Sequence, residues 1–139
     1  MRLTFPPVVA LLAISIALGG CQVGEAPEAT PSGLPDYAYR SPLALKGYQV
    51  ALAEGELLSR LPCYCGCGQD SRYRSLRDCF LTDQGEFTSH GANCQVCLEE
   101  VEDAARWKDG GLSTREIREL IDGKYEGRGP PTDTPPVNE

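Results

Sequence analysis

Apolar residues recur every three or four positions in three segments of the chain, which is the spacing of one face of an α-helix. The first segment predicts a helix from Leu45 to Leu61, because Pro62 cannot continue it. A cysteine-rich segment follows this predicted helix directly. The apolar positions of the predicted helix are Val50, Ala53, Leu57, Leu58 and Leu61.

The second segment opens on a pair of cysteines, Cys94 and Cys97, just after a favourable helix-starting residue at Asn93. Residues 109–111, Asp-Gly-Gly, are expected to end this helix. The N-terminus of a helix stabilises the thiolate form of cysteine, which binds metal ions or attacks disulfides. The two thiols are expected on one face, together with Val101 and Ala104, and most of the acidic residues elsewhere: Glu99, Glu100, Glu102 and Asp103.

The third segment begins with residues 113–116, Ser-Thr-Arg-Glu, which form a capping-box sequence. Between the first two predicted helices, residues 71–80 favour a short helical turn. Its side chains at Leu76, Cys79 and Phe80 are expected to point into the core. No segment alternates in the manner of a strand. The buried stripe of the third helix, which we expect to be core without chemistry, consists of Ile117, Leu120, Ile121 and Tyr125.

Residues 22–42 and 126–139 are rich in proline and offer few apolar side chains. Such composition predicts an unpacked tether before the domain and a free, disordered tail after it. The expected fold class is therefore mostly α: a small helical domain over residues 43–125, with a cysteine-rich metal-binding loop, between disordered Pro-rich segments. A domain of this size has a marginal core, so metal ions or disulfides are expected to stabilise it.

Residues 1–20 have the pattern of a secretory signal peptide, with a positive charge at Arg2 and an apolar run too short to span a membrane. The sequence Leu-Gly-Gly-Cys at 18–21 resembles a bacterial lipobox, which implies cleavage before Cys21 and attachment of acyl chains such as palmitate. An ordinary secreted protein is the alternative. Two or three acyl chains would anchor the lipoprotein firmly on the extracytoplasmic side of a bacterial cell membrane.

Charge and motifs narrow the classes of function. The chain has 13 Lys and Arg residues against 20 Asp and Glu residues, a net charge of −7, which argues against nucleic acid as a partner. No phosphate-binding loop and no nucleophile paired with a general base is evident. Enzyme activity is therefore not expected, apart from thiol redox chemistry.

Six cysteines remain when Cys21 is set aside, and an even number in an oxidising compartment favours three disulfides. However, Cys63, Cys65 and Cys67 are separated by one residue each, too close for unstrained bridges within the loop. Each would then need a partner among the other three thiols, which makes a full set of disulfides possible but crowded. These partners would be Cys79, Cys94 and Cys97.

A soft metal ion is the other interpretation of the cysteines. Thiolates at alternate positions of an extended loop can point to one side, and Gly66 and Gly68 let the chain curl around an ion. Thiolates in this number suit Cu(I) or Zn, and the only histidine, His90, is either a further ligand or a surface residue. Tyr64 and Tyr73 either shield the site or pack in the ordinary way. The expected ligands are Cys63, Cys65, Cys67, Cys79, His90, Cys94 and Cys97.

Three stretches of this sequence resemble the PCYCGC-motif lipoproteins of bacteria: PCYCGCG at 62–68, SLRDCF at 75–80 and HGANCQVC at 90–97. The resemblance runs from about Leu61 to Tyr125. Because the function of that family is not established, it implies a location and a shared cysteine site more than an activity. Family members often carry a histidine near the position where this chain has Arg72 and Tyr73.

A second resemblance, over residues 94–97 and 111–125, is to the helical domain of the thiol reductases of cytochrome c maturation. It implies a Cys-x-x-Cys pair that cycles between thiol and disulfide, but it does not account for the cysteines of the loop. The leading hypothesis is a membrane-anchored protein that binds Cu(I) or Zn, for metal handling or structure, with a metal-donor or metal-acceptor protein as a possible partner. The alternatives are a thiol-disulfide oxidoreductase that uses Cys94 and Cys97, or a disulfide-stapled interaction domain.

Overall fold

The computed structural model describes residues 33–138, and this part of the chain is built from helices without a named strand. The prediction of a mostly α fold is therefore confirmed. The predicted signal peptide and Cys21 lie outside the described residues. None of the described helices has the length and apolar composition that a membrane span requires. The α-helices are α1 (Pro42–Ala53), α2 (Gly55–Ser59), α3 (Gln95–Asp109) and α4 (Thr114–Tyr125), and the 3-10 helices are η1 (Asp36–Arg40), η2 (Cys67–Gln69), η3 (Arg77–Cys79) and η4 (Gly91–Asn93).

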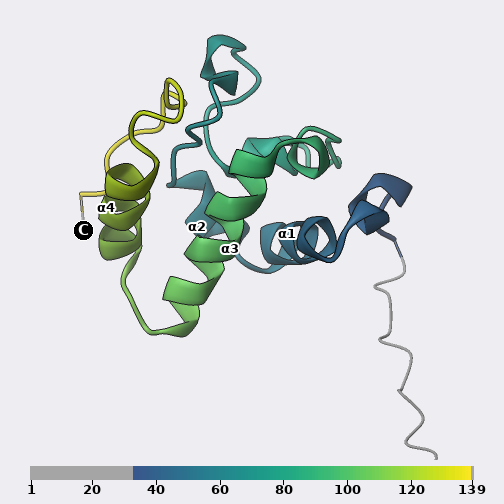
Figure 1. Ribbon diagram of the computed structural model, residues 1–139, viewed down its shortest axis with the longest axis horizontal. Coiled ribbons are helices and arrows are strands. Elements are labelled where there is room, and N and C mark those ends of the chain that lie inside the picture. The colour runs from purple at the N-terminus through teal and green to yellow at the C-terminus, as the bar shows by residue number, and fades with distance from the viewer. Residues whose placement is uncertain (1–32, 139) are drawn as a thin grey trace, which may run out of the picture. The chain divides into compact units, whose positions relative to one another are not determined.

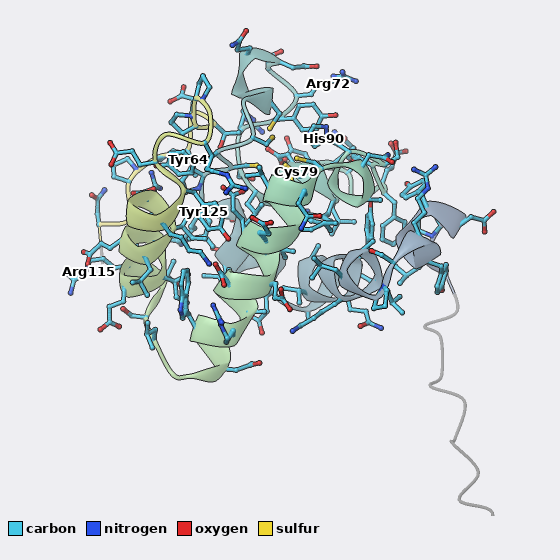
Figure 2. The ribbon with its side chains drawn as sticks, viewed as in Figure 1. Tyr64, Arg72, Cys79, His90, Arg115 and Tyr125 are labelled. Carbon is cyan, nitrogen blue, oxygen red and sulfur yellow. The ribbon has the colours of Figure 1, made fainter. Side chains whose placement is uncertain are left out.

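Helix α3 is the central element, because it packs against both α1 and α4 (Figure 1). The approach to α1 is close at Gly47, where an added Cβ would lie 2.9 Å from Phe80 and 3.3 Å from Val101. A side chain there would collide with the Phe80 ring and press on the facing side of α3. On the side of α4, Tyr64 and Tyr125 fill the space next to α3 (Figure 2).

The first predicted helix is broken in the structure. Glu54 adopts φ −119° and ψ 31°, outside the helical region, and separates α1 from α2. Gly55 follows at once, and glycine weakens a helix by losing more backbone entropy than other residues. The break leaves Ala53 exposed, so its predicted place in the apolar stripe is wrong, and it buries Leu58.

The third predicted helix is α4, and its capping box is present. The Ser113 hydroxyl accepts a hydrogen bond from the Glu116 backbone N–H, and the Glu116 carboxylate accepts one from the Ser113 N–H at 2.8 Å. The predicted stripe is correct at Ile117, Ile121 and Tyr125, which are buried. It is wrong at Leu120, which is 41% exposed.

The segment after α4 is packed, so the prediction of a free tail is wrong. We call residues 129–135 the C-terminal strap. The backbone N–H of Thr132 donates to the Cys63 carbonyl at 3.0 Å, and the Cys63 N–H donates to the Thr132 hydroxyl at 2.9 Å. Thr134 is also buried, and its hydroxyl donates to the Arg74 carbonyl at 2.6 Å. Prolines prevent this segment from forming a helix but leave an extended chain free to pair with the cysteine loop.

The packed domain also starts earlier than predicted. Residues before 43 were expected to form an unpacked tether, but Asp36–Arg40 form η1 and Ala38 is completely buried. Helix α1 then begins at Pro42, and the Ser41 hydroxyl caps it by accepting a hydrogen bond from the Ala44 N–H. A proline in the first turn is compatible with a helix, because no intrahelical donor is lost there.

Candidate metal centre

The cysteine loop, residues 61–69, is held in a curled path between α2 and η3. Leu61 accepts a backbone hydrogen bond from Leu76, which ties the loop to the chain before η3. Gly66 adopts φ +82°, a left-handed conformation that favours glycine. At Gly68 a Cβ would lie 2.8 Å from the strap backbone, at the Pro131 carbonyl oxygen. The two glycines that the sequence singled out therefore turn the loop and let the strap approach it.

Six sulfur atoms and one imidazole meet beside this loop, near the start of α3, where Figure 2 shows Cys79 and His90. Their donor atoms form two groups of four, and within each group all donor atoms lie within 4.8 Å of one another. The structure thus brings together all seven predicted ligands, and their binding of an ion stays a prediction. The first group is Cys63, Cys65, Cys67 and Cys79, and the second is Cys65, His90, Cys94 and Cys97.

Short contacts connect the donor atoms within and between the two groups. The Sγ atoms of Cys67 and Cys79 are 4.0 Å apart, and Cys65 Sγ lies 3.5 Å from His90 Nε2. The two groups touch where the Sγ atoms of Cys63 and Cys97 are 3.5 Å apart. The six cysteines of the described chain are free thiols, so the structure does not contain the disulfides that a stapled domain would need.

The negative charge of the metal-free cluster concentrates on Cys65. Hydrogen bonds from its neighbours, above all Cys63, lower the pKa of the Cys65 thiol, while the hydrogen bond to Cys65 raises that of Cys63. Hydrogen bonds to Cys65 and then Cys67 raise the pKa of His90 to about 9. Both shifts favour the pairing of a Cys65 thiolate with a protonated His90.

The two thiols of the Cys-x-x-Cys pair lie among other thiols that raise their pKa. Cys94 is the N-cap of α3, and hydrogen bonding to Cys65 raises its pKa to about 11. The pKa of Cys97 is also raised. Its hydrogen bond with Cys63 lowers this pKa, but its hydrogen bond with Cys65 and its complete burial raise it. The thiolate stabilisation expected from the helix N-terminus is thus opposed by the neighbouring thiols.

Glu100 is a residue of this site that the sequence interpretation missed. It was assigned to the polar side of its helix, but it is completely buried. Its Oε1 accepts a hydrogen bond from the Tyr64 backbone N–H at 2.8 Å, while its Oε2 has no hydrogen-bond partner among the described residues. Burial raises the pKa of this carboxyl group to about 7. Its spacing of three residues from Cys97 was the available signal, since such residues share a helix face.

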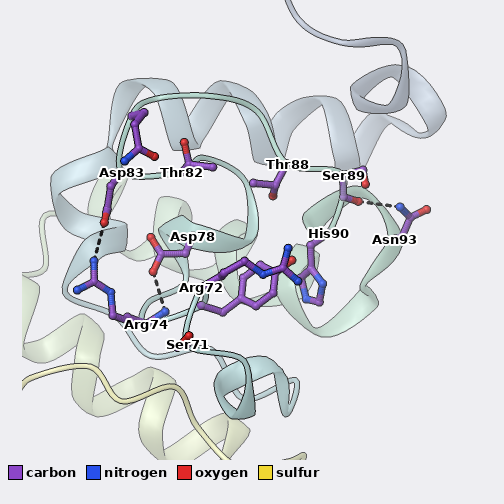
Figure 3. A pocket seen from close by; sticks show the side chains of 12 residues that line it. Ser71, Arg72, Arg74, Asp78, Thr82, Asp83, Thr88, Ser89, His90 and Asn93 are labelled. Atoms are coloured by element: carbon purple, nitrogen blue, oxygen red, sulfur yellow. Dashed lines mark hydrogen bonds and ion pairs between the residues drawn. The ribbon is translucent and has the colours of Figure 1, made fainter.

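A cavity of about 860 Å³ opens on the side of the cluster where His90 lies (Figure 3). His90 lines this cavity, and none of the other candidate ligands does. Its ring lies against Tyr73, with ring centroids 4.6 Å apart, so Tyr73 covers one face of a candidate ligand. Tyr64 instead donates a hydrogen bond from its hydroxyl to Asp122 at 2.8 Å, which is ordinary packing against α4.

Comparison with known proteins gives one match. A family model described as "Protein of unknown function with PCYCGC motif" matches residues 22–137. No curated protein and no solved structure matches the chain. The matched residues include both donor groups, α4 and the whole strap.

Proposed function

We propose that this chain binds a soft metal ion outside a bacterial membrane. The chain belongs to the family of proteins of unknown function with the PCYCGC motif. The observation that carries the proposal is the convergence of six thiols and one imidazole into groups of four within 4.8 Å. Thiolate and imidazole donors in such sets suit Zn and Cu(I). A bound ion would also protect free thiols in an oxidising compartment.

The arrangement supports metal handling as well as a structural role. Cys65 and His90 are only partly buried, and the cavity beside His90 gives access from one side. Cys63, Cys79 and Cys97 are completely buried, so an ion held by them would stabilise the fold. An ion with ligands of both kinds could be passed to or from a donor or acceptor protein.

The metal content of the protein tests this proposal. The full chain with Cys21→Ala, which removes the thiol outside the described site, is purified anaerobically in detergent. Zinc, copper and free thiols are measured before and after treatment with a chelator. We expect stoichiometric metal with reduced thiols, and the same result for Ser89→Ala, which changes a neighbour of His90 on the cavity wall. Metal-free protein with a readily reducible bridge between Cys94 and Cys97 would support the oxidoreductase instead.

The location is proposed from Cys21 and the sequence before it. We expect the chain to label with a palmitate analogue and to fractionate with membranes when expressed in a bacterium. Cys21→Ser should abolish the label and release the protein from the lipid anchor, since the serine hydroxyl does not replace the acylated sulfur. Equal labelling of both forms would contradict the lipoprotein assignment.

A further inference from the structure

We propose that the cluster holds two Zn(II) ions at once, with the thiolate of Cys65 as a ligand bridging them. This inference rests on the proposed metal-binding function and extends it to a dinuclear centre. One ion would be bound by the first donor group, which consists of sulfur alone. The other would be bound by the second group, which contains His90.

The number of donors favours two ions over one. Structural zinc is almost always bound by four ligands in a tetrahedron. The two groups of four contain seven different residues because they share only Cys65. Two tetrahedra that share one corner need seven donors. A single ion would leave three donors unused, in a cluster where Cys63, Cys79 and Cys97 are completely buried.

The distances between donors already approach those of two tetrahedra. A Zn–S bond of about 2.3 Å implies a separation of about 3.8 Å between two sulfur ligands of one ion. The pair of Cys67 and Cys79 in the first group is 4.0 Å apart, and Cys65 lies 3.5 Å from the His90 nitrogen in the second. These two pairs already have nearly the separation that two ligands of one ion require, and the other donor atoms of each group lie within 4.8 Å of one another.

Cys65 has the position that a bridging ligand requires. Its Sγ atom lies within 4.8 Å of the sulfur atoms of Cys63, Cys67 and Cys79 in the first group and of Cys94 and Cys97 in the second. It also contacts His90. Its sulfur thus faces both groups, and a thiolate has enough lone pairs to bind two ions.

The charge of the cluster favours Zn(II) over Cu(I) for this arrangement. Two Zn(II) ions compensate four of the six thiolate charges, whereas two Cu(I) ions compensate only two. Uncompensated charge in a largely buried cluster costs free energy, because the interior solvates it poorly. A neutral His90 in the second group adds a ligand without adding negative charge.

Zinc stoichiometry in matched variants tests the bridge. The full chain with Cys21→Ala is reduced, freed of metal, titrated with ZnCl₂, exposed to a weak chelator and analysed by native mass spectrometry. We expect two bound ions in this protein and in Ser89→Ala, and one each in Cys79→Ala and His90→Ala. Cys65→Ala should retain none, because it leaves both ions with three ligands. One retained ion in Cys65→Ala would overturn the shared ligand.

Cobalt provides a measurement whose deciding result comes from the unmutated site. When Co(II) replaces zinc, a bridging thiolate couples the spins of the two ions, so the magnetic moment per cobalt should fall as the second equivalent binds. His90→Ala, with one ion, should keep the uncoupled moment. Two cobalt ions with uncoupled moments would overturn the bridge.

The outcomes for the unmutated site separate the two proposals. If it binds no zinc, copper or cobalt with its thiols reduced, metal binding itself is wrong. If it binds one ion tightly and no second, the metal-binding function stands and the dinuclear centre is wrong.

Discussion

Glu100 places a carboxyl group in the interior beside the cysteine loop, where its charge is poorly solvated. Its pKa is raised from 4.5 to about 7. Between these two pH values the folded state therefore keeps a proton on Glu100 that the unfolded state has lost. Stability from this group is complete below pH 4.5 and is lost as the pH rises through 7. The carboxyl group is nevertheless useful, because it holds the Tyr64 backbone between Cys63 and Cys65.

Glu100→Gln should therefore remove a pH dependence while keeping the hydrogen bond to Tyr64. In urea unfolding of the metal-free, reduced proteins, the unfolding free energy of the parent should fall relative to that of Glu100→Gln, by on the order of 3 kcal/mol, between pH 5 and 8. Glu102→Gln, at an exposed position of the same helix, should retain the fall. Equal pH profiles for the parent protein and Glu100→Gln would contradict the assignment.

Two glycines give opposite expectations for the same substitution. A Cβ at Gly91 would lie 2.5 Å from the Phe80 ring and 2.9 Å from the Cys79 carbonyl, so Gly91→Ala should destabilise the protein by about 1–3 kcal/mol. A Cβ at Gly123, inside α4, meets nothing within 4 Å, so Gly123→Ala should stabilise it by about 0.5–1 kcal/mol. Thermal unfolding followed by circular dichroism measures both, and effects of the same sign would contradict this packing.

At the scale of elements, the C-terminal strap closes the cysteine loop from outside the helices. Thr132 pairs with Cys63 through both backbone and side chain, and Arg118 of α4 donates to the Pro135 carbonyl at 3.1 Å. Gly129 is needed for the close fit, since a Cβ there would lie 2.8 Å from the Tyr64 carbonyl oxygen. The strap therefore links α4 to the loop that carries three of the candidate ligands.

Thr132→Val tests this link between the strap and the loop. It removes the hydroxyl that accepts the hydrogen bond of the buried Cys63 N–H. We expect a loss of about 1–3 kcal/mol in unfolding free energy and faster loss of bound zinc to a chelator. Asp133→Asn changes an exposed neighbour on the strap and should have neither effect. Unchanged zinc release in Thr132→Val would show that the strap does not hold the loop in place.

At the scale of the whole molecule, metal binding and folding should be coupled. The ligands come from the loop, from η3, from His90 and from the start of α3, so an ion would join segments that are far apart in the chain. Ions that bind the folded state preferentially raise its stability by mass action.

Removal of metal should accordingly lower the thermal midpoint of the reduced protein, and added zinc should restore it. The double variant with Cys79→Ala and His90→Ala, which reduces each donor group, should respond less to zinc than Ser89→Ala. The measurement is a thermal melt with and without chelator under anaerobic conditions. Equal midpoints with and without metal would mean that the ions do not contribute to the fold.

The sequence by itself determined the features that depend on neighbours along the chain. The period of apolar residues predicted the helical fold, Ser113 and Glu116 predicted the start of α4, and the types of side chain predicted the seven candidate ligands. Helix periodicity and capping act within about four residues, so a local pattern is enough to find them.

The tertiary structure alone decided the features that join distant residues. The burial of Glu100 depends on its contact with Tyr64, and the packing of the strap depends on the pairing of Thr132 with Cys63. The position of Cys65 in both donor groups depends on where η4 and α3 bring His90 and the second pair of cysteines. These contacts exist only after the chain has folded back on itself, and neither composition nor periodicity records which distant segments then meet.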